Sequence, residues 1–525
     1  MARSELFRGV ERALRLAWAA ERGGCSTSDV LERNALATSS RRTFLKGMAA
    51  GIAAASCGRP ARPSQSGAEI CVVGAGIAGL TCAYRLKNAG LRVRLFEAQD
   101  RVGGRMFSLR GHFPDAQVVE LGGELIDSGH THLRALAGEL GLALDDLSQG
   151  SAELSRALWY FGGSVRSEPE VVEAFRPIAQ AIARDVAVIG EGTIGYRTPL
   201  GAEALDLESL SHWLDRQGVR DWIRALLDVA YTTEMGLPCD HQSALNLLTF
   251  ISTEPDPFRV FGESDERYHV RGGNDAITSE LAKRLGWALE TGWVLESVRQ
   301  RAGQDFELSF RGGSASRTLV ASHVVLALPL TTLRRVELTV ELPDVQRQAI
   351  RELAYGTNSK LMIGFAHRLW REGRRSDGSS FSDLPYQTTW EASRAQPGES
   401  GVLVNFTGGL QGLAIGSGSA ADQAQRAVRD LEQVYPGITA LRAGMREARF
   451  HWPSHPWALG SYMCPGPGDW TRFGGAFTEP AGRLRFAGEH CSAEAQGFME
   501  GGCESGERVA AELLQELTTQ RAAAG

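Results

Sequence analysis

A glycine-rich turn between a strand and a helix decides the fold class of this chain. The apolar residues 70–73 predict a buried parallel strand, and residues 80–88 have the pattern of a helix. Between them, Gly74 permits a tight turn, Gly76 lets a pyrophosphate approach the backbone, and Gly79 allows the helix to pack closely on the strand. The free N–H groups at the start of the helix suit a phosphate. This unit predicts a Rossmann-type α/β fold with a dinucleotide site.

A second loop strengthens this interpretation. A predicted strand, residues 92–96, ends at Glu97, whose carboxylate is placed to accept hydrogen bonds from ribose hydroxyls. An acid at this position disfavours a 2′-phosphate, so FAD or NAD fits better than NADP. The pair Gly103–Gly104 follows, flanked by Arg101 and Arg105, and can wrap phosphate oxygens from the other side. NAD dehydrogenases do not require such a second loop.

The two loops together resemble the FAD-binding segment of the flavin amine oxidases, which include monoamine, polyamine and L-amino-acid oxidases. The C-terminal run Phe486-Ala487-Gly488-Glu489-His490, followed by Gly497-Phe498-Met499-Glu500-Gly501-Gly502, is similar to the closing motif of the same family. The resemblance covers residues 69–514 and is nearest to bacterial L-amino-acid oxidase-like members exported by the twin-arginine route. It implies a Rossmann-type FAD-binding domain interleaved with an α+β substrate domain, in which helices flank a mixed sheet.

The resemblance also implies how FAD is held. The Gly122–Gly123 turn would bring backbone close to the flavin ring, and Glu489 would lie towards the ribityl and phosphate groups. A helix that starts near Met499 would aim its positive end at the flavin edge where negative charge accumulates on reduction. The residues expected to bind FAD are Gly74, Gly76, Ala78, Gly79, Glu97, Ala98, Gly103, Gly104, Arg105, Gly122, Gly123, Glu124, Val294, Gly488, Glu489, Gly497, Phe498 and Met499.

Three further residues are expected to act in catalysis. Lys360 aligns with the family lysine that reaches flavin N5 through a water, and we expect it to help dioxygen react with reduced flavin. Tyr462 and Phe498 fall where the family places two aromatic rings that align the amine. Ser461 occupies the position at which monoamine oxidases carry the cysteine bonded to flavin. FAD is therefore expected to be noncovalent, with Cys464 as the nearest candidate for a linkage.

The implied reaction is oxidative deamination. Hydride transfer to flavin N5 leaves an imine that hydrolyses to a carbonyl compound and ammonia, and dioxygen reoxidises the flavin to give hydrogen peroxide. The expected substrate is an L-amino acid, which would need an arginine for its carboxylate. A monoamine or polyamine oxidase, with an apolar or acidic pocket, is the alternative. A flavin dehydrogenase or desaturase that uses another electron acceptor is a more distant one.

Composition excludes several other classes. The chain has 525 residues, 43% of them hydrophobic and 22% charged, which is enough for two domains. The formal net charge of -6 leaves no basic stripe for nucleic acid. The eight cysteines and the histidines have no metal-ligand spacing, so no metal site is expected. The remaining partners are a small amine or amino acid and dioxygen, and a homodimer is compatible with these features.

The first part of the chain differs in composition from the rest. Residues 40–46 contain Arg41 and Arg42, and an Ala/Gly-rich run follows at residues 47–55. Together the two segments resemble a twin-arginine export signal. The run is too short for a membrane span. We therefore expect export to the periplasm or the extracellular space.

The predicted domains alternate along the chain. They are 1–66 for the leader and linker, 67–150 for the first part of the FAD-binding domain, 151–265 for the helical part of the substrate domain, 266–342 for the second FAD-binding part, 343–455 for the sheet of the substrate domain, and 456–525 for the third FAD-binding part with the C-terminal helix.

Overall fold

The fold was taken from a computed structural model, which describes residues 16–17, 20, 26, 69–149, 153–155, 157–190, 192–249 and 264–524. The predicted twin-arginine motif lies outside these residues. In the described part of the chain, no helix is both long and apolar enough to cross a membrane.

A parallel sheet forms the first structural layer. Its strands, in the order β22-β13-β1-β2-β9, all pair in parallel. They are β22 (Leu484–Phe486), β13 (His323–Leu326), β1 (Glu69–Val73), β2 (Arg92–Phe96) and β9 (Leu289–Glu290). These strands come from separate stretches of the chain, so residues from 69 to 486 contribute to one sheet.

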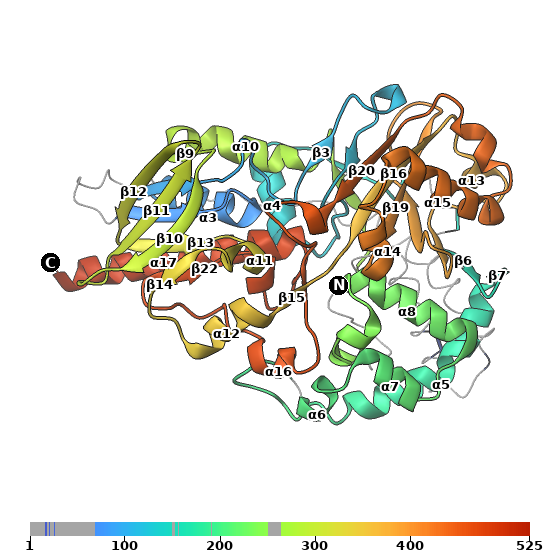
Figure 1. Cartoon of the computed structure of the whole chain (residues 1–525), viewed down its shortest axis with the longest axis horizontal. Coiled ribbons are helices and arrows are strands. Elements are labelled where there is room, and N and C mark those ends of the chain that lie inside the picture. The colour runs from blue at the N-terminus through green and yellow to red at the C-terminus, as the bar shows by residue number, and fades with distance from the viewer. Residues whose placement is uncertain are drawn as a thin grey trace, which may run out of the picture.

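Helices cover one face of the parallel sheet. The helix α3 (Ile77–Asn88) lies against α17 (Met499–Ala524) and α10 (Asp275–Leu285), and their apolar side chains share one core cluster with Val72 and Leu95. A side chain at Gly506 of α17 would overlap the Ala78 carbonyl oxygen. Small residues therefore let these two helices touch closely, as the left part of Figure 1 shows.

A second sheet covers the other face of the parallel sheet. It has the order β12-β11-β10-β14. Its strands are β10 (Val294–Gln300), β11 (Phe306–Gly312), β12 (Ala315–Ala321) and β14 (Glu337–Thr339). The rings of Phe96 and Phe310 stack across this interface with centroids 4.4 Å apart. This contact belongs to a separate apolar cluster that also contains Cys71 and Val73.

A mixed sheet forms the other half of the molecule, at the upper right of Figure 1. Its order is β20-β16-β19-β18-β17-β6-β7. Its strands are β6 (Leu158–Phe161), β7 (Ser164–Arg166), β16 (Ser359–Phe365), β17 (Ser380–Ser382), β18 (Thr388–Glu391), β19 (Gly401–Thr407) and β20 (Glu447–His451). Every residue of β16 and β19 is buried. The helix α15 (Ala420–Val434) begins with a capping box at Ser419 and packs its apolar face on this sheet.

A helical group lies below the mixed sheet in Figure 1. It contains α5 (Glu168–Val186), α6 (Glu203–Asp206), α7 (Leu210–Arg216), α8 (Asp221–Met235) and α9 (Leu245–Leu248). Leu16, Ala17 and Ala20 are buried in the same apolar cluster as these helices. The amphipathic pattern of residues 151–265 predicted the helices, but this segment also supplies β6 and β7.

Shorter elements join these layers. The remaining strands are β3 (Ser108–Leu109), β4 (Val119–Glu120), β5 (Leu144–Asp146), β8 (Tyr268–Val270), β15 (Ala354–Tyr355) and β21 (Met463–Cys464). The remaining α-helices are α4 (Thr131–Glu139), α11 (Leu330–Leu333), α12 (Asp344–Glu352), α13 (Leu369–Glu372), α14 (Gly409–Ala414) and α16 (Asp469–Phe473). The predicted mixed α/β architecture, with sheets flanked by helices, is confirmed.

Candidate active site

A cavity of about 590 Å³ is lined by residues from both halves of the molecule. This volume is typical of a site for a cofactor and a small ligand. The turn after β1, the end of β2, strand β16 and the start of α17 all contribute to its walls. Of the residues predicted to bind FAD, all but Gly79 line the cavity, as do Lys360 and Tyr462. Gly79 instead faces the Gly74 carbonyl and Ala327, where a side chain would not fit.

The phosphate end of the cavity is formed by the glycine-rich turn. Gly74 has a φ of +100°, and the space beside Gly76 is open. The first turn of α3 contains no acidic residue, and no side chain caps it. Its N–H groups are therefore available to an anion.

Glu97 lies beside this turn and is 6% exposed. Its carboxylate accepts hydrogen bonds from the backbone N–H groups of Ala75 (2.7 Å) and Gln99 (2.9 Å). Burial raises the pKa of Glu97, and these hydrogen bonds counteract part of that effect. The chain itself therefore fixes the carboxylate at the position where the sequence predicts a ribose.

His490 provides a test of whether a cofactor fits. It is buried and lines the cavity, and burial lowers its pKa to about 4, so the imidazole is neutral. In the part of the chain that the structure describes, neither ring nitrogen has a hydrogen-bond partner. Buried polar groups are normally paired. The neutral ring adds no charge to the cavity wall, and the uncapped start of α3 beside the open space at Gly76 suits a phosphate, so the residues present fit FAD.

Glu489 ties the last predicted motif to the rest of the site. Its carboxylate forms an ion pair with Arg105 (3.0 Å) and accepts hydrogen bonds from the backbone N–H groups of Met463 (3.1 Å) and Gly497 (2.8 Å). Arg105 also donates to the Ser461 carbonyl (2.8 Å). The contacts hold together two predicted FAD loops that are separated by more than 380 residues.

Aromatic side chains line the opposite end of the cavity. Tyr462 donates its hydroxyl to the Glu234 carbonyl (2.7 Å), and the Phe498 ring lies against His130 with centroids 5.4 Å apart. Trp390 and Phe406 line the same cavity, with ring centroids 5.4 Å apart. Tyr462 and Phe498 were predicted from the sequence, but the second pair of rings was not.

Lys360 and Glu124 form a buried ion pair in the cavity wall. Lys360 Nζ lies 2.7 Å from a Glu124 carboxylate oxygen, and the two residues are 5% and 9% exposed. The ammonium also donates to the carbonyls of Gly122 (2.8 Å) and Glu120 (3.2 Å). Both residues were predicted site residues, but their pairing was not predicted, because 236 residues separate them in sequence.

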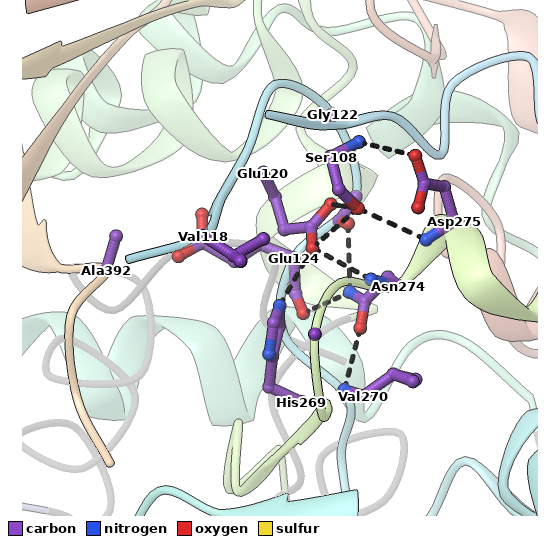
Figure 2. Close-up of polar contacts among 12 residues, drawn as sticks. Ser108, Val118, Glu120, Gly122, Glu124, His269, Val270, Asn274, Asp275 and Ala392 are labelled. Atoms are coloured by element: carbon purple, nitrogen blue, oxygen red, sulfur yellow. Dashed lines mark hydrogen bonds and ion pairs between the residues drawn. The ribbon is translucent and has the colours of Figure 1, made fainter. Parts of the chain in front are cut away.

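A second buried polar network lies behind the Gly122–Gly123 turn (Figure 2). The carboxylate of Glu120 contacts His269 (2.8 Å), Ser108 Oγ (2.8 Å) and the backbone N–H of Asn274 (2.8 Å). Burial lowers the pKa of His269, but the hydrogen bond and the charge of Glu120 outweigh burial, so the pKa is raised. The network joins β4, β8 and the start of α10.

Acidic side chains accompany the aromatic end of the cavity. Asp127 and Glu266 both line it and are 1% and 4% exposed. One Asp127 carboxylate oxygen accepts a hydrogen bond from the Glu266 backbone N–H (2.6 Å), and the other lies 3.4 Å from His130 Nε2. Because His130 touches Phe498, these acids lie near the predicted substrate position. The sequence analysis missed both, although Asp127 follows the predicted Gly122–Gly123 turn closely.

Among the described residues, the arginines that line the cavity are Arg105, Arg311 and Arg335. Arg105 pairs with Glu489, and Arg311 pairs with Glu296 at 2.6 Å. Arg335 lies 3.5 Å from the Pro456 carbonyl. Within the described ranges, none of the three forms an ion pair with Asp127 or Glu266.

The two positions considered for a covalent flavin bond differ in access. Ser461 lines the cavity and donates its hydroxyl to Asn358 (2.6 Å). Cys464 is fully buried in β21, inside the apolar cluster of the helical group, and does not line the cavity.

Comparison with known proteins identifies the family of this chain. The family model described as flavin containing amine oxidoreductase matches residues 77–514. The putative L-amino-acid oxidase YobN of Bacillus subtilis is 24% identical over 472 residues, which cover 86% of this chain and 95% of that protein. An L-amino acid dehydrogenase of Synechocystis is 25% identical and covers 86% and 96%.

Among solved structures, cyclohexylamine oxidase from Brevibacterium oxydans shares the fold, with a TM-score of 0.75 and 21% identity over 86% of this chain and 100% of that one. The family match covers most of the chain, from residue 77 in helix α3 to residue 514 in α17, and includes the C-terminal motif. The chain therefore belongs to the family of flavin-containing amine oxidoreductases.

Proposed function

We propose that this protein is an FAD-dependent oxidase that deaminates a cationic amine without a carboxylate group. FAD would accept a hydride equivalent from the carbon beside the substrate nitrogen, and dioxygen would then be reduced to hydrogen peroxide. The observation that carries the substrate class is the pair of buried acids, Asp127 and Glu266, at the aromatic end of the cavity.

Charge explains why these acids favour an amine. A buried carboxylate attracts an ammonium group and repels a second carboxylate. Hydride transfer requires the reacting nitrogen to be neutral, so the acids suit a second, charged nitrogen of a diamine or polyamine. The rings of Tyr462 and Phe498 would orient the reacting carbon and exclude water. This proposal departs from the L-amino acid expected on sequence grounds.

An L-amino-acid oxidase is the second candidate. Relatives named as an L-amino-acid oxidase and an L-amino acid dehydrogenase favour it. This function requires an arginine that reaches the substrate carboxylate. Among the described residues that line the cavity, Arg105 and Arg311 pair with Glu489 and Glu296, so Arg335 is the arginine that this candidate would use. Because one relative is named as a dehydrogenase, an electron acceptor other than dioxygen is an alternative for this chain as well.

A peroxide-release screen separates these candidates. The purified protein with bound FAD is supplied with the twenty L-amino acids, primary monoamines and polyamines, and peroxide is measured by a coupled peroxidase assay. We expect the highest kcat/KM with a diamine or polyamine, and a fall of about tenfold or more in Asp127→Asn with that substrate. If an L-amino acid is the best substrate, the proposed substrate class is wrong. Turnover without peroxide would contradict the proposed oxidase activity.

We further propose that FAD is held noncovalently. Ser461 stands where monoamine oxidases carry the cysteine bonded to flavin, and its hydroxyl cannot replace that thiol, while Cys464 lies outside the cavity lining. The protein band on a denaturing gel should therefore show no flavin fluorescence. A fluorescent band that persists after denaturation would identify a covalent bond.

The proposed location is outside the cytoplasm. Arg41 and Arg42, followed by the Ala/Gly-rich residues 47–55, support export by the twin-arginine route. Replacement of both arginines with Lys should retain the protein in the cytoplasmic fraction. Unchanged export of this double variant would contradict the proposed route.

A further inference from the structure

The ammonium group of Lys360 already has a complete set of acceptors within the chain. A protonated lysine has three N–H donors. In the structure, three oxygen atoms lie within hydrogen-bond distance: one carboxylate oxygen of Glu124 (2.7 Å) and the carbonyls of Gly122 (2.8 Å) and Glu120 (3.2 Å). The arrangement therefore fits a charged lysine better than a neutral one, which would have only two donors.

Glu124 is held from two sides. One carboxylate oxygen accepts from Lys360, and the other accepts from the indole N–H of Trp390 (3.0 Å). The Lys360 ammonium also lies 5.3 Å from the centre of a Trp390 ring, within the range of a cation–π contact. The anion, the cation and the aromatic ring thus form one buried unit that lines the cavity.

The backbone of the turn is fixed as well. The Asn274 side-chain amide donates to the carbonyls of Gly123 (3.1 Å) and Glu124 (2.6 Å), while the Asn274 backbone N–H donates to Glu120. Figure 2 shows Glu120, Glu124 and Asn274 gathered at this turn. Because both sides of the turn are anchored, Glu124 cannot turn away from Lys360 without the loss of several hydrogen bonds.

We propose that Glu124 is a positioning residue that holds the Lys360 ammonium in place and balances its charge, so that this wall of the cofactor cavity is electrically neutral. The inference rests on the proposed FAD site but not on the choice of substrate. A bound flavin becomes more negative on reduction. A single unbalanced charge in this poorly hydrated wall would therefore change how easily the flavin is reduced, whereas the intact pair changes it little.

Charge balance predicts opposite effects for the two partners. Glu124→Gln leaves Lys360 unbalanced, so the flavin midpoint potential should rise. Lys360→Met leaves Glu124 unbalanced, so the potential should fall. Each single variant should change the reduction equilibrium by about tenfold or more, which is about 30 mV for a two-electron couple. The double variant Glu124→Gln/Lys360→Met should return close to the unmodified protein.

The potentials are measured by chemical reduction of the FAD-loaded protein against a reference dye, which requires no substrate. Glu391→Gln is a matched control. Glu391 follows Trp390 in the sequence, is fully buried and forms an ion pair with Arg371, but it does not line the cavity. It should leave the potential unchanged. Shifts of the same sign in both single variants, or no shift in either, would overturn the inference.

A second measurement covers the case in which a variant fails to retain FAD. A buried ion pair that loses one partner leaves an uncompensated charge, whereas loss of both partners does not. In thermal unfolding of the cofactor-free proteins, the double variant should therefore be more stable than Glu124→Gln alone. A double variant that is no more stable than this single variant would contradict the pairing. If no substrate yields peroxide while both results hold, the proposed function fails and the role of Glu124 stands.

Discussion

Single residues of the site supply two different properties, charge and shape. Lys360 and Glu124 place two opposite charges in the cavity wall, while Tyr462 and Phe498 provide flat apolar surfaces. Asp127 adds negative charge near Phe498. Replacement of individual side chains can therefore separate substrate orientation from electron transfer.

Phe498 is expected to act on the substrate through its ring. Phe498→Leu keeps an apolar side chain but removes the flat face, so kcat/KM for the preferred substrate should fall by about tenfold, with FAD still bound. Steady-state kinetics and the flavin absorbance check this. Phe406→Leu, which changes another ring of the cavity, is the comparison. An equal loss in both variants would show that general packing, rather than Phe498, orients the substrate.

Lys360 is expected to influence the reaction with dioxygen. Lys360→Met leaves the negative Glu124 in the wall, which opposes electron transfer to dioxygen because that product is also negative. Reoxidation of the chemically reduced flavin should slow by about tenfold or more, while KM changes much less. Stopped-flow mixing with oxygenated buffer measures the rate. A reoxidation rate equal to that of the unmodified protein would remove this role.

At the scale of secondary-structure elements, close helix packing and buried polar networks fix the site. The glycines of α17 allow it to approach α3, and the network of Glu120 joins β4 and β8 to α10. Both features place the turns that line the cavity. Each can be tested without any substrate.

Gly506→Ala should weaken the contact between α17 and α3. The new methyl group would overlap the Ala78 carbonyl oxygen, and such overpacking costs about 1–3 kcal/mol. Chemical denaturation measures the free energy of unfolding. Gly138→Ala in α4 is the control, because its methyl group would meet no atom within 4 Å. Equal stability of the two variants would contradict the close contact.

The His269–Glu120 pair should make stability depend on pH. Because Glu120 raises the pKa of His269 in the folded state, the pair stabilises the fold fully below the unfolded pKa of about 6.5, and this contribution is lost as pH rises through the folded pKa. The stability advantage over His269→Gln should therefore shrink between about pH 6 and about pH 9. Chemical denaturation at both pH values checks this, and a constant difference would exclude the pair as a pH-dependent element.

The sequence predicted the elements whose signals are local. The glycine-rich turn, the apolar run of β1 and the strand β2 were recognised because their residues are neighbours in the chain. The strands β6 and β7 were missed: β6 joins the mixed sheet by pairing with β17, more than 200 residues away, and β7 joins it through β6. Glu124 and Lys360 were both identified, but their ion pair depends on the same kind of distant contact.

At the scale of the whole molecule, the cavity joins two halves that the chain visits alternately. The parallel sheet provides the phosphate end, and the mixed sheet provides Lys360 and Trp390. A ligand that fills this cavity contacts both halves and binds only the folded chain. Bound FAD should therefore raise the stability of the whole protein, by about 2.7 kcal/mol when its free concentration is 100 times Kd.

The central claim is that this cavity holds one FAD per chain. Titration of the cofactor-free protein with FAD, followed by flavin fluorescence and by thermal unfolding of the same samples, tests it most directly. We predict saturation at one FAD per chain together with a rise in the unfolding temperature. Gly76→Leu should bind FAD more weakly, because its side chain fills the open space at the phosphate end. A well-folded protein that takes up no FAD and shows no change in unfolding temperature would contradict the account.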